Sequence, residues 1–144
     1  MSRPNVLQAR QALELWGGWL DMWNKDPAVA LDIIDDDYAL HIPDMTSTID
    51  PGTVRRPADM KNWVTGFTDK FEGLTYSTLM GPIMEPEQAL FGFRWEGRGT
   101  WTGATGWPLD RPGEPVLFVG VDIFRVRGDR IAEAWSQGAV TRTL

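Results

Sequence analysis

Apolar side chains in the first part of the chain recur every three or four residues, the spacing that places side chains on one face of a helix. Four residues with this spacing predict a helix over residues 5–24: Leu13, Trp16, Leu20 and Trp23. Gly17 and Gly18 interrupt it, and each costs about 1 kcal/mol relative to alanine. We therefore expect another element to pack closely against this turn.

The next segment begins with Asp26-Pro27, a capping carboxylate followed by a first-turn proline. This pair predicts a second helix, which we expect to end in the solvated acidic run of residues 35–37. A short strand should follow over residues 38–43, and then a loop over residues 44–56. A third helix should open at Pro57 and close at Gly73, with one apolar stripe: Met60, Trp63, Phe67 and Phe71.

The second half of the chain changes to alternating apolar and polar positions, which is typical of strands. Four strands are predicted: residues 74–84, 89–102, 115–127 and 130–140. Three helices followed by a run of antiparallel strands predict an α+β fold. We expect one domain over residues 1–144.

The segment Val116–Val126 is apolar on both faces of its predicted strand. One face can pack against the helices. The other face needs a cover of its own, and we expect a second copy of the chain to supply it. The expected assembly is a homodimer through the outer face of the sheet.

Charge and composition narrow the function classes. The 144 residues carry 14 Lys and Arg against 20 Asp and Glu, a net charge of −6. This balance argues against nucleic acid or anionic membranes as partners. The chain has no cysteine and one histidine, so we expect neither a metal site nor a thiol nucleophile. With no membrane-length apolar run or signal sequence recognised, we expect a soluble, cytoplasmic protein that needs no cofactor.

Eight tryptophans in one chain of this length are unusual. Large rings with one N–H donor suit a deep core, and they also suit the wall of a pocket for a flat organic ligand. We assign most of them to the core or to subunit contacts and two or three to a pocket.

Asp122 is the first candidate for chemistry, because it stands alone between Val121 and Ile123 on an apolar strand. A buried carboxyl either keeps its proton with a raised pKa or finds a hydrogen-bond donor. A neutral acid in an apolar cavity can donate to a developing oxyanion or exchange a proton with carbon. The structural alternative is an Asp tied to backbone N–H groups or to an Arg.

Several further polar residues have both a functional and a structural interpretation. His41 could be the only imidazole base, with Asp44 beside it if the chain turns at Pro43, or it could be a structural residue. Arg94 and Glu96 project to the same side of a strand, where they form either an exposed ion pair or the polar end of a pocket. Trp135 and Gln137 share a face whose direction depends on a bulge.

The order of these elements resembles the nuclear transport factor 2-like superfamily. The resemblance rests on a helix ending in DDDYALHIP, a helix opening at Pro57, and long strands finishing VGVDIFRVRGDRIAEAW. It implies a cone-shaped barrel in which three helices pack on a curved, mostly antiparallel sheet. SnoaL-like polyketide cyclases and ketosteroid isomerases are the most similar members. In the isomerases the strand V-x-D-V-x-R-F carries the oxyanion-hole Asp, which matches Asp122 in VDIFRV.

The chain departs from these relatives at other catalytic positions. The isomerase base would fall on Ile42, before Pro43, so His41 or Asp44 would have to replace it. The cyclase motif Gly-Thr-His-x-Gly reads GTWTG here, with Trp101 at the His, and no acid follows Trp135. Limonene-epoxide hydrolases use an Arg-x-Asp pair, which Arg94-Trp95-Glu96 loosely matches, but Gln137 cannot act as their second acid.

The sequence thus predicts a cofactor-independent enzyme for proton transfer, cyclisation or isomerisation of a bulky apolar substrate that is polyketide-, terpene- or steroid-like. Asp122 and His41 are the expected catalytic residues. The expected substrate contacts are Tyr38, Asp44, Trp63, Phe67, Arg94, Trp101, Phe118, Phe124, Trp135 and Gln137. Two alternatives remain: a non-catalytic binding or dimerisation module, and an epoxide hydrolase of the limonene-epoxide hydrolase type.

Overall fold

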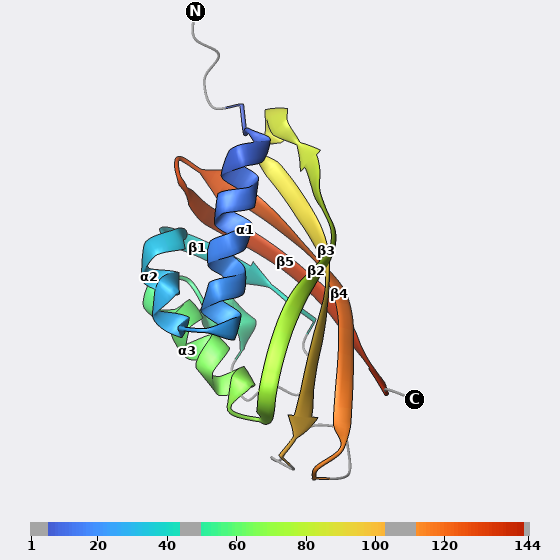
Figure 1. Ribbon diagram of the computed structural model, residues 1–144. Helices are drawn as coiled ribbons and strands as arrows, with labels where there is room; N and C mark the ends of the chain where they lie inside the picture. Colours follow the sequence, from blue (N-terminus) through green and yellow to red (C-terminus); the bar gives the residue numbers. More distant parts are fainter. Residues whose placement is uncertain (1–5, 44–49, 103–111, 143–144) are drawn as a thin grey trace, which may run out of the picture.

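A layer of helices covers one face of a curved sheet (Figure 1). The computed structural model describes residues 6–43, 50–102 and 112–142. The helical elements in chain order are α1 (Ala9–Asn24), the 3-10 turn η1 (Pro27–Val29), α2 (Ala30–Ile33), the 3-10 turn η2 (Pro51–Thr53), α3 (Pro57–Thr68) and the 3-10 turn η3 (Pro86–Gln88).

The strands form one sheet in the order β1-β5-β4-β3-β2. Their bounds are β1 (Ile34–His41), β2 (Phe71–Glu85), β3 (Leu90–Trp101), β4 (Pro115–Arg127) and β5 (Arg130–Arg142). β1 pairs with β5 in parallel, and every other neighbouring pair is antiparallel. The predicted α+β class, with helices packed on a curved and mostly antiparallel sheet, is confirmed.

The second helix is shorter than predicted, and the acidic run does not end it. Residues 35–37 lie in β1, an edge strand that buries Ile34 and Tyr38 and exposes Asp36 and Asp37. The Arg127 side chain of β4 lies 3.2 Å from the Asp35 carboxylate and partly neutralises the run. The prediction of a helix end was therefore wrong, because pairing with β5 outweighs the local pattern.

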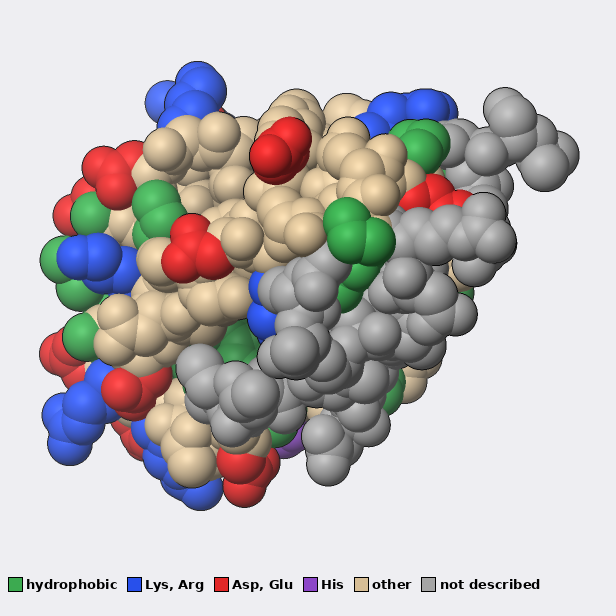
Figure 2. All heavy atoms as spheres, turned by 90° about the horizontal axis from the view of Figure 1, so that it is seen from below, with side chains coloured by type: hydrophobic (Ala, Val, Ile, Leu, Met, Phe, Trp, Pro, Cys, Tyr) green, Lys and Arg blue, Asp and Glu red, His purple; other side chains and the backbone are tan. Residues whose placement is uncertain are grey.

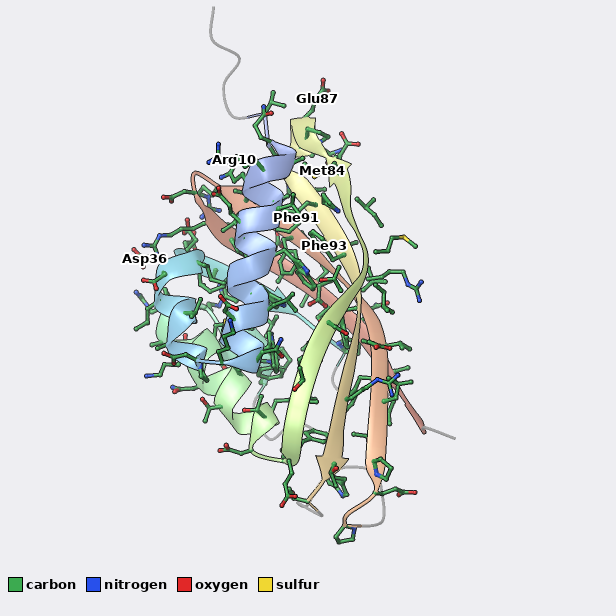
Figure 3. The ribbon with its side chains drawn as sticks, viewed as in Figure 1. Arg10, Asp36, Met84, Glu87, Phe91 and Phe93 are labelled. Atoms are coloured by element: carbon green, nitrogen blue, oxygen red, sulfur yellow. The ribbon has the colours of Figure 1, made fainter. Side chains whose placement is uncertain are left out.

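The buried stripe of α1 is rotated from the predicted one. Leu13 is 52% exposed, whereas Ala12, Leu15 and Trp19 are buried. Apolar residues surround much of this helix, so two stripes fit the same spacing, and contact with the sheet selects one of them. Phe91 and Phe93 of β3 fill the space between α1 and the sheet, while Arg10, Asp36 and Glu87 point outward (Figure 3).

A bulge in β5 decides which of its side chains point inward. The register with β4 shifts between Arg125 and Val126, whose partners are Glu133 and Ile131. The extra residue lets Ile131 and Ala134 both be buried, although they do not alternate. Beyond the bulge, Ser136 faces the helices and Trp135 faces outward.

At the lower end of the molecule, side chains of both charges are interspersed around the rim (Figure 2).

The two adjacent glycines of α1 differ in their surroundings. A Cβ on Gly17 would meet nothing within 4 Å, whereas one on Gly18 would lie 2.9 Å from Ile33 Cγ2. The close packing expected at this turn is therefore present at Gly18 and not at Gly17.

We expect Gly17→Ala to raise the free energy of unfolding by about 1 kcal/mol, because alanine is the better helix former and meets no neighbour. Gly18→Ala should be less stable than Gly17→Ala by about 1 kcal/mol or more, because Ile33 must move. Urea denaturation of both variants measures this difference. Equal gains at the two positions would contradict the packing described here.

Candidate functional site

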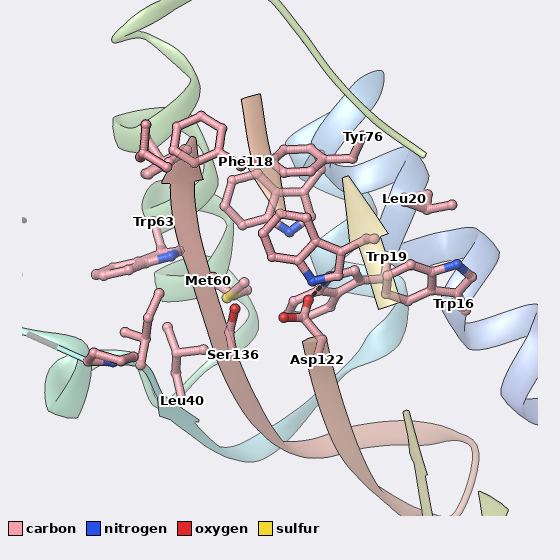
Figure 4. A pocket seen from close by; sticks show the side chains of 17 residues that line it. Trp16, Trp19, Leu20, Leu40, Met60, Trp63, Tyr76, Phe118, Asp122 and Ser136 are labelled. Atoms are coloured by element: carbon pink, nitrogen blue, oxygen red, sulfur yellow. Dashed lines mark hydrogen bonds between the residues drawn. The ribbon is translucent and has the colours of Figure 1, made fainter. Parts of the chain in front are cut away.

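An aromatic pocket lies between α1, α3 and the inner face of the sheet (Figure 4). Its volume is about 90 Å³. An apolar cavity of about 150 Å³ binds benzene, so this smaller space takes a single ring only when its walls move outward. The rings that line it are Trp16, Trp19, Trp23, Trp63, Phe67, Tyr76, Trp95 and Phe118.

Asp122 brings a carboxyl into this apolar space from β4. Its side chain is 4% exposed, and Trp19 Nε1 donates a hydrogen bond of 3.1 Å to its Oδ2. Burial raises the pKa of this carboxyl from 3.8 to about 6, against the opposing effects of Ser136, Trp95 and Trp19, which favour the charged form. A group with this pKa exists in both protonation states near neutral pH.

Three indole N–H groups in the pocket have different partners. Trp16 Nε1 donates to Thr78 Oγ1 at 2.8 Å, and Trp19 donates to Asp122. Trp95 Nε1 is buried and has no hydrogen-bond partner among the described residues. The Trp95 indole lowers the pKa of Asp122 without meeting hydrogen-bond geometry, so the two groups are close but not directly paired.

A pair of glycines fixes the position of the Trp95 ring. Gly120 of β4 pairs with Gly138 of β5, and Trp95 of β3 pairs with Gly120. A Cβ on Gly120 would lie 2.5 Å from Trp95 Cζ2, and one on Gly138 would lie 2.9 Å from Cη2. The indole therefore extends across two neighbouring strands, over backbone that carries no side chains.

Tyr76 of β2 completes this wall. Its ring meets the Trp95 ring edge-on, with 5.2 Å between centroids. Asn24, the last residue of α1, holds the Tyr76 backbone with two hydrogen bonds of 2.7 and 2.8 Å. Burial first, and then the charge of Asp122, raise the pKa of the Tyr76 phenol well above its ordinary value, so this hydroxyl stays neutral.

His41 lies on the other side of the sheet from Asp122. Its Nε2 is 2.6 Å from Glu133 Oε2, and its ring stacks on Trp135 at 5.1 Å. Arg125 also binds Glu133, at 3.2 Å, and sits over the Trp135 ring. These four side chains form an outer cluster in a groove that also includes Gln137. The structure does not bring His41, Trp135 or Gln137 together with Asp122.

The remaining expected contacts divide between pocket, core and surface. Trp63, Phe67 and Phe118 line the pocket with Asp122. Arg94 is exposed, and Glu96 pairs with Arg98 at 3.5 Å rather than with Arg94. Asp44 lies outside the described residues.

Three other expected contacts are buried in the core outside the pocket lining. The Tyr38 hydroxyl donates to Met60 Sδ at 3.6 Å, and burial, followed by the charge of Asp122, raises its pKa. Trp101 packs on Phe71, with 5.2 Å between ring centroids. Phe124 packs under Trp19 at 4.7 Å.

Sequence reasoning did not single out Trp95 or Ser136 as residues of an Asp122 pocket. Trp95 enters the sequence analysis only as the middle residue of Arg94-Trp95-Glu96. Ser136 pairs directly across from Asp122 in the β4–β5 register. A usable signal was present, since Trp95 alternates with outward-facing Arg94 and Glu96 and must share the inner face.

The described residues contain no group of three or more His, Asp or Glu side chains arranged to hold a metal ion. Among them, no helix is both long and apolar enough to cross a membrane.

Residues 16–134 match the SnoaL-like domain family, and the chain belongs to it. The resemblance to the SnoaL-like family is therefore confirmed. No protein of curated function matches the sequence.

Solved structures share the fold at low sequence identity. IdmH of Streptomyces antibioticus, a candidate polyketide cyclase, superposes with a TM-score of 0.71 at 21% identity, over 89% of this chain and 91% of its own. A candidate polyketide cyclase of Acidithiobacillus ferrooxidans gives 0.70 at 18% identity, over 96% and 91%. A nuclear transport factor 2-like protein of Anabaena variabilis gives 0.71 at 16%, over 96% and 94%.

The raised pKa of Asp122 predicts a pH dependence of stability. The folded-state pKa of about 6 exceeds the unfolded value of 3.8, so the stability that Asp122 contributes is fully present below pH 3.8 and is lost as the pH rises through 6. The full loss corresponds to about 3 kcal/mol. Asp122→Asn keeps an acceptor for Trp19 and does not titrate, so it should gain stability relative to the parent protein by this order above about pH 7.

Urea denaturation of both proteins between about pH 4 and pH 7.5 measures the effect. The same pH dependence in parent and variant would show that Asp122 does not carry a raised pKa.

Proposed function

We propose that this chain is a small cofactor-independent enzyme that catalyses enolisation of a bulky apolar ketone of the polyketide, terpene or steroid kind. Enolisation is the proton-transfer step shared by aldol-type cyclisation and by double-bond isomerisation. Membership of the SnoaL-like family and the structural similarity to candidate polyketide cyclases support this class of reaction. The observation that carries it is the buried Asp122 carboxyl, with a pKa of about 6, inside an aromatic pocket.

In the proposed step, neutral Asp122 donates its proton to the carbonyl oxygen of the substrate. The C–H bond next to that carbonyl breaks, and its proton passes to water at the pocket rim near the exposed Pro43. The products are an enol and an Asp122 carboxylate, which Trp19 stabilises and which water reprotonates. Positioned general acid catalysis of this kind contributes about 10²–10⁴-fold.

The pocket volume constrains how a bulky substrate would bind. One ring carrying the reacting carbonyl enters the space of about 90 Å³ when the walls move outward. The remainder would extend past Ile42 and Pro43, where β1 has ended and β5 is paired with β4 alone. A substrate of several rings is therefore held by one end.

Exchange of ketone α-hydrogens with D₂O, followed by NMR, tests this function directly with cyclohexanone as a one-ring probe. We expect Asp122→Asn to reduce protein-dependent exchange by about 10²-fold or more. Asp36→Asn, which changes an exposed acid on β1, should leave the rate unchanged.

The rate of ketone exchange catalysed by the parent protein should also fall about tenfold per pH unit above about pH 7, because neutral Asp122 is the active form. Exchange that rises with pH through 6 would instead make Asp122 a base. Saturable binding without any exchange would support the alternative of a non-catalytic binding module.

No observation favours epoxide hydrolysis. Arg94 and Glu96, which would carry it, alternate with the inward Phe93 and Trp95 and project from the outer face of the sheet.

We also propose that a second copy of the chain covers the outer face. Val121 and Ile123 of β4 are 36% and 43% exposed there, beside the outer cluster. That cluster carries Arg125 and Glu133 3.2 Å apart, so this face already neutralises its own charges and adds little net charge for a second copy to oppose. The sheet's outer face is thus suited to self-association.

Sedimentation velocity measures this assembly. We expect a dimer. Ile123→Glu should raise the dissociation constant of this dimer at least about tenfold, because the substitution buries a charge in the interface. Leu13→Glu, at an equally exposed apolar position on α1, should leave the dimer intact. A parent protein that stays monomeric, or equal effects of both variants, would contradict the proposal.

A further inference from the structure

Two buried polar atoms face the pocket with no partner among the described residues: Nε1 of Trp95 and Oδ1 of Asp122. Native structures rarely leave such atoms unpaired, because each unmet hydrogen bond costs about 1–3 kcal/mol. One atom is a fixed donor, and the other is an acceptor when the carboxyl is ionised. A group that satisfies both must accept one hydrogen bond and donate another.

The sheet register places these two atoms as neighbours. Trp95 pairs with Gly120, and Asp122 is two residues further along β4 on the same face, so the side chains are diagonal neighbours. The Gly120–Gly138 pair fixes the indole from below, and Trp19 fixes the other carboxylate oxygen. Both groups are therefore held in place before any ligand binds.

We propose that Trp95 determines substrate specificity by recognising, together with Asp122, a single hydroxyl group of an enol or phenol on a flat apolar ring. The hydroxyl oxygen accepts from Trp95 Nε1, and its proton is donated to Asp122 Oδ1. This rests on the proposed function, because the enol is the species that proton transfer from Asp122 leaves in the pocket.

Other ligand groups satisfy this pair less well. An ether or a carbonyl accepts from Trp95 but gives nothing to an ionised Asp122. A carboxylate or phosphate would add a negative charge beside one that is already buried. A water molecule can bridge the two atoms in the free protein, and a ligand hydroxyl that displaces it reproduces both of its hydrogen bonds.

The walls select the rest of the ligand. Tyr76 and Trp95 meet edge-on, and Trp23 meets Tyr76 in the same manner at 5.3 Å, so ring faces and edges surround the space. A flat six-membered ring suits this lining, and it is the largest group that the volume of about 90 Å³ takes with outward movement of the walls. The expected ligand class is a phenol, or a cyclic enol with the same shape.

Three one-ring probes separate the hydroxyl from the ring: 4-fluorophenol, 4-fluoroanisole and 4-fluorotoluene. Titration by ¹⁹F NMR at about pH 7.5 should show the phenol binding at least about tenfold more tightly than either of the others. Trp95→Phe keeps a ring over the glycines and removes the donor, so it should abolish this preference and change the affinity for 4-fluorotoluene little. Trp135→Phe, the same exchange in the outer cluster, should preserve the preference.

A second readout needs no variant. Among the indole N–H resonances in a ¹H–¹⁵N spectrum, that of Trp95, assigned through its contacts with the protons of Gly120 and Gly138, should move downfield with 4-fluorophenol and not with 4-fluorotoluene. An unmoved Trp95 resonance, a preference retained in Trp95→Phe, or no binding of any probe would each overturn the proposal.

The two proposals fail separately. Ketone exchange that depends on Asp122 without any preference for the phenol would leave the proposed function standing and remove Trp95 from recognition. A preference for the phenol without ketone exchange would support recognition by Trp95 and contradict the proposed function.

Discussion

The hydrogen bond from Trp19 to Asp122 connects the helical layer to the sheet inside the aromatic pocket. A carboxylate at this depth is stabilised by an indole N–H from α1, which meets one of its oxygens, and by Ser136 and Trp95 nearby. The contact fixes how α1 lies over β4, and with it the stack of Trp16 on Phe93 at 4.5 Å. The helix angle, the aromatic packing and the protonation behaviour of the site therefore share one origin.

Alternation along single strands carried most of what the sequence could predict. The start of the third helix at Pro57 and the inward direction of Asp122 follow from local spacing, and the structure agrees with them. The predicted end of that helix at Gly73 was wrong, because α3 ends at Thr68 and Phe71 already begins β2. The acidic run was misassigned because a short helix end and an edge strand look alike over three charged residues. Its strand character comes from pairing with β5, where Ile34 meets Ile131 nearly a hundred residues away.

The pocket lay further beyond sequence reasoning, because its geometry depends on register. Ser136 faces Asp122 only because a bulge precedes it in β5, and the same bulge turns Trp135 to the outer face. No spacing within one strand reveals that Gly120 and Gly138 pair, or that Trp95 lies over both. The tryptophan count indicated an aromatic pocket, but the fold decided which rings form it and left His41 outside.

The paired glycines give this pocket a floor made of main chain. The N–H and C=O groups of that floor are already engaged by neighbouring strands, so it presents neither charge nor unmet hydrogen bonds to whatever lies above it. On this side the shape of the cavity is thus set by the Trp95 ring, which rests on a neutral surface. Substitution of Trp95 changes the shape of the pocket for other substrates while the sheet beneath stays as it is. This arrangement offers a simple route to divergence among proteins with paired glycines under one aromatic ring.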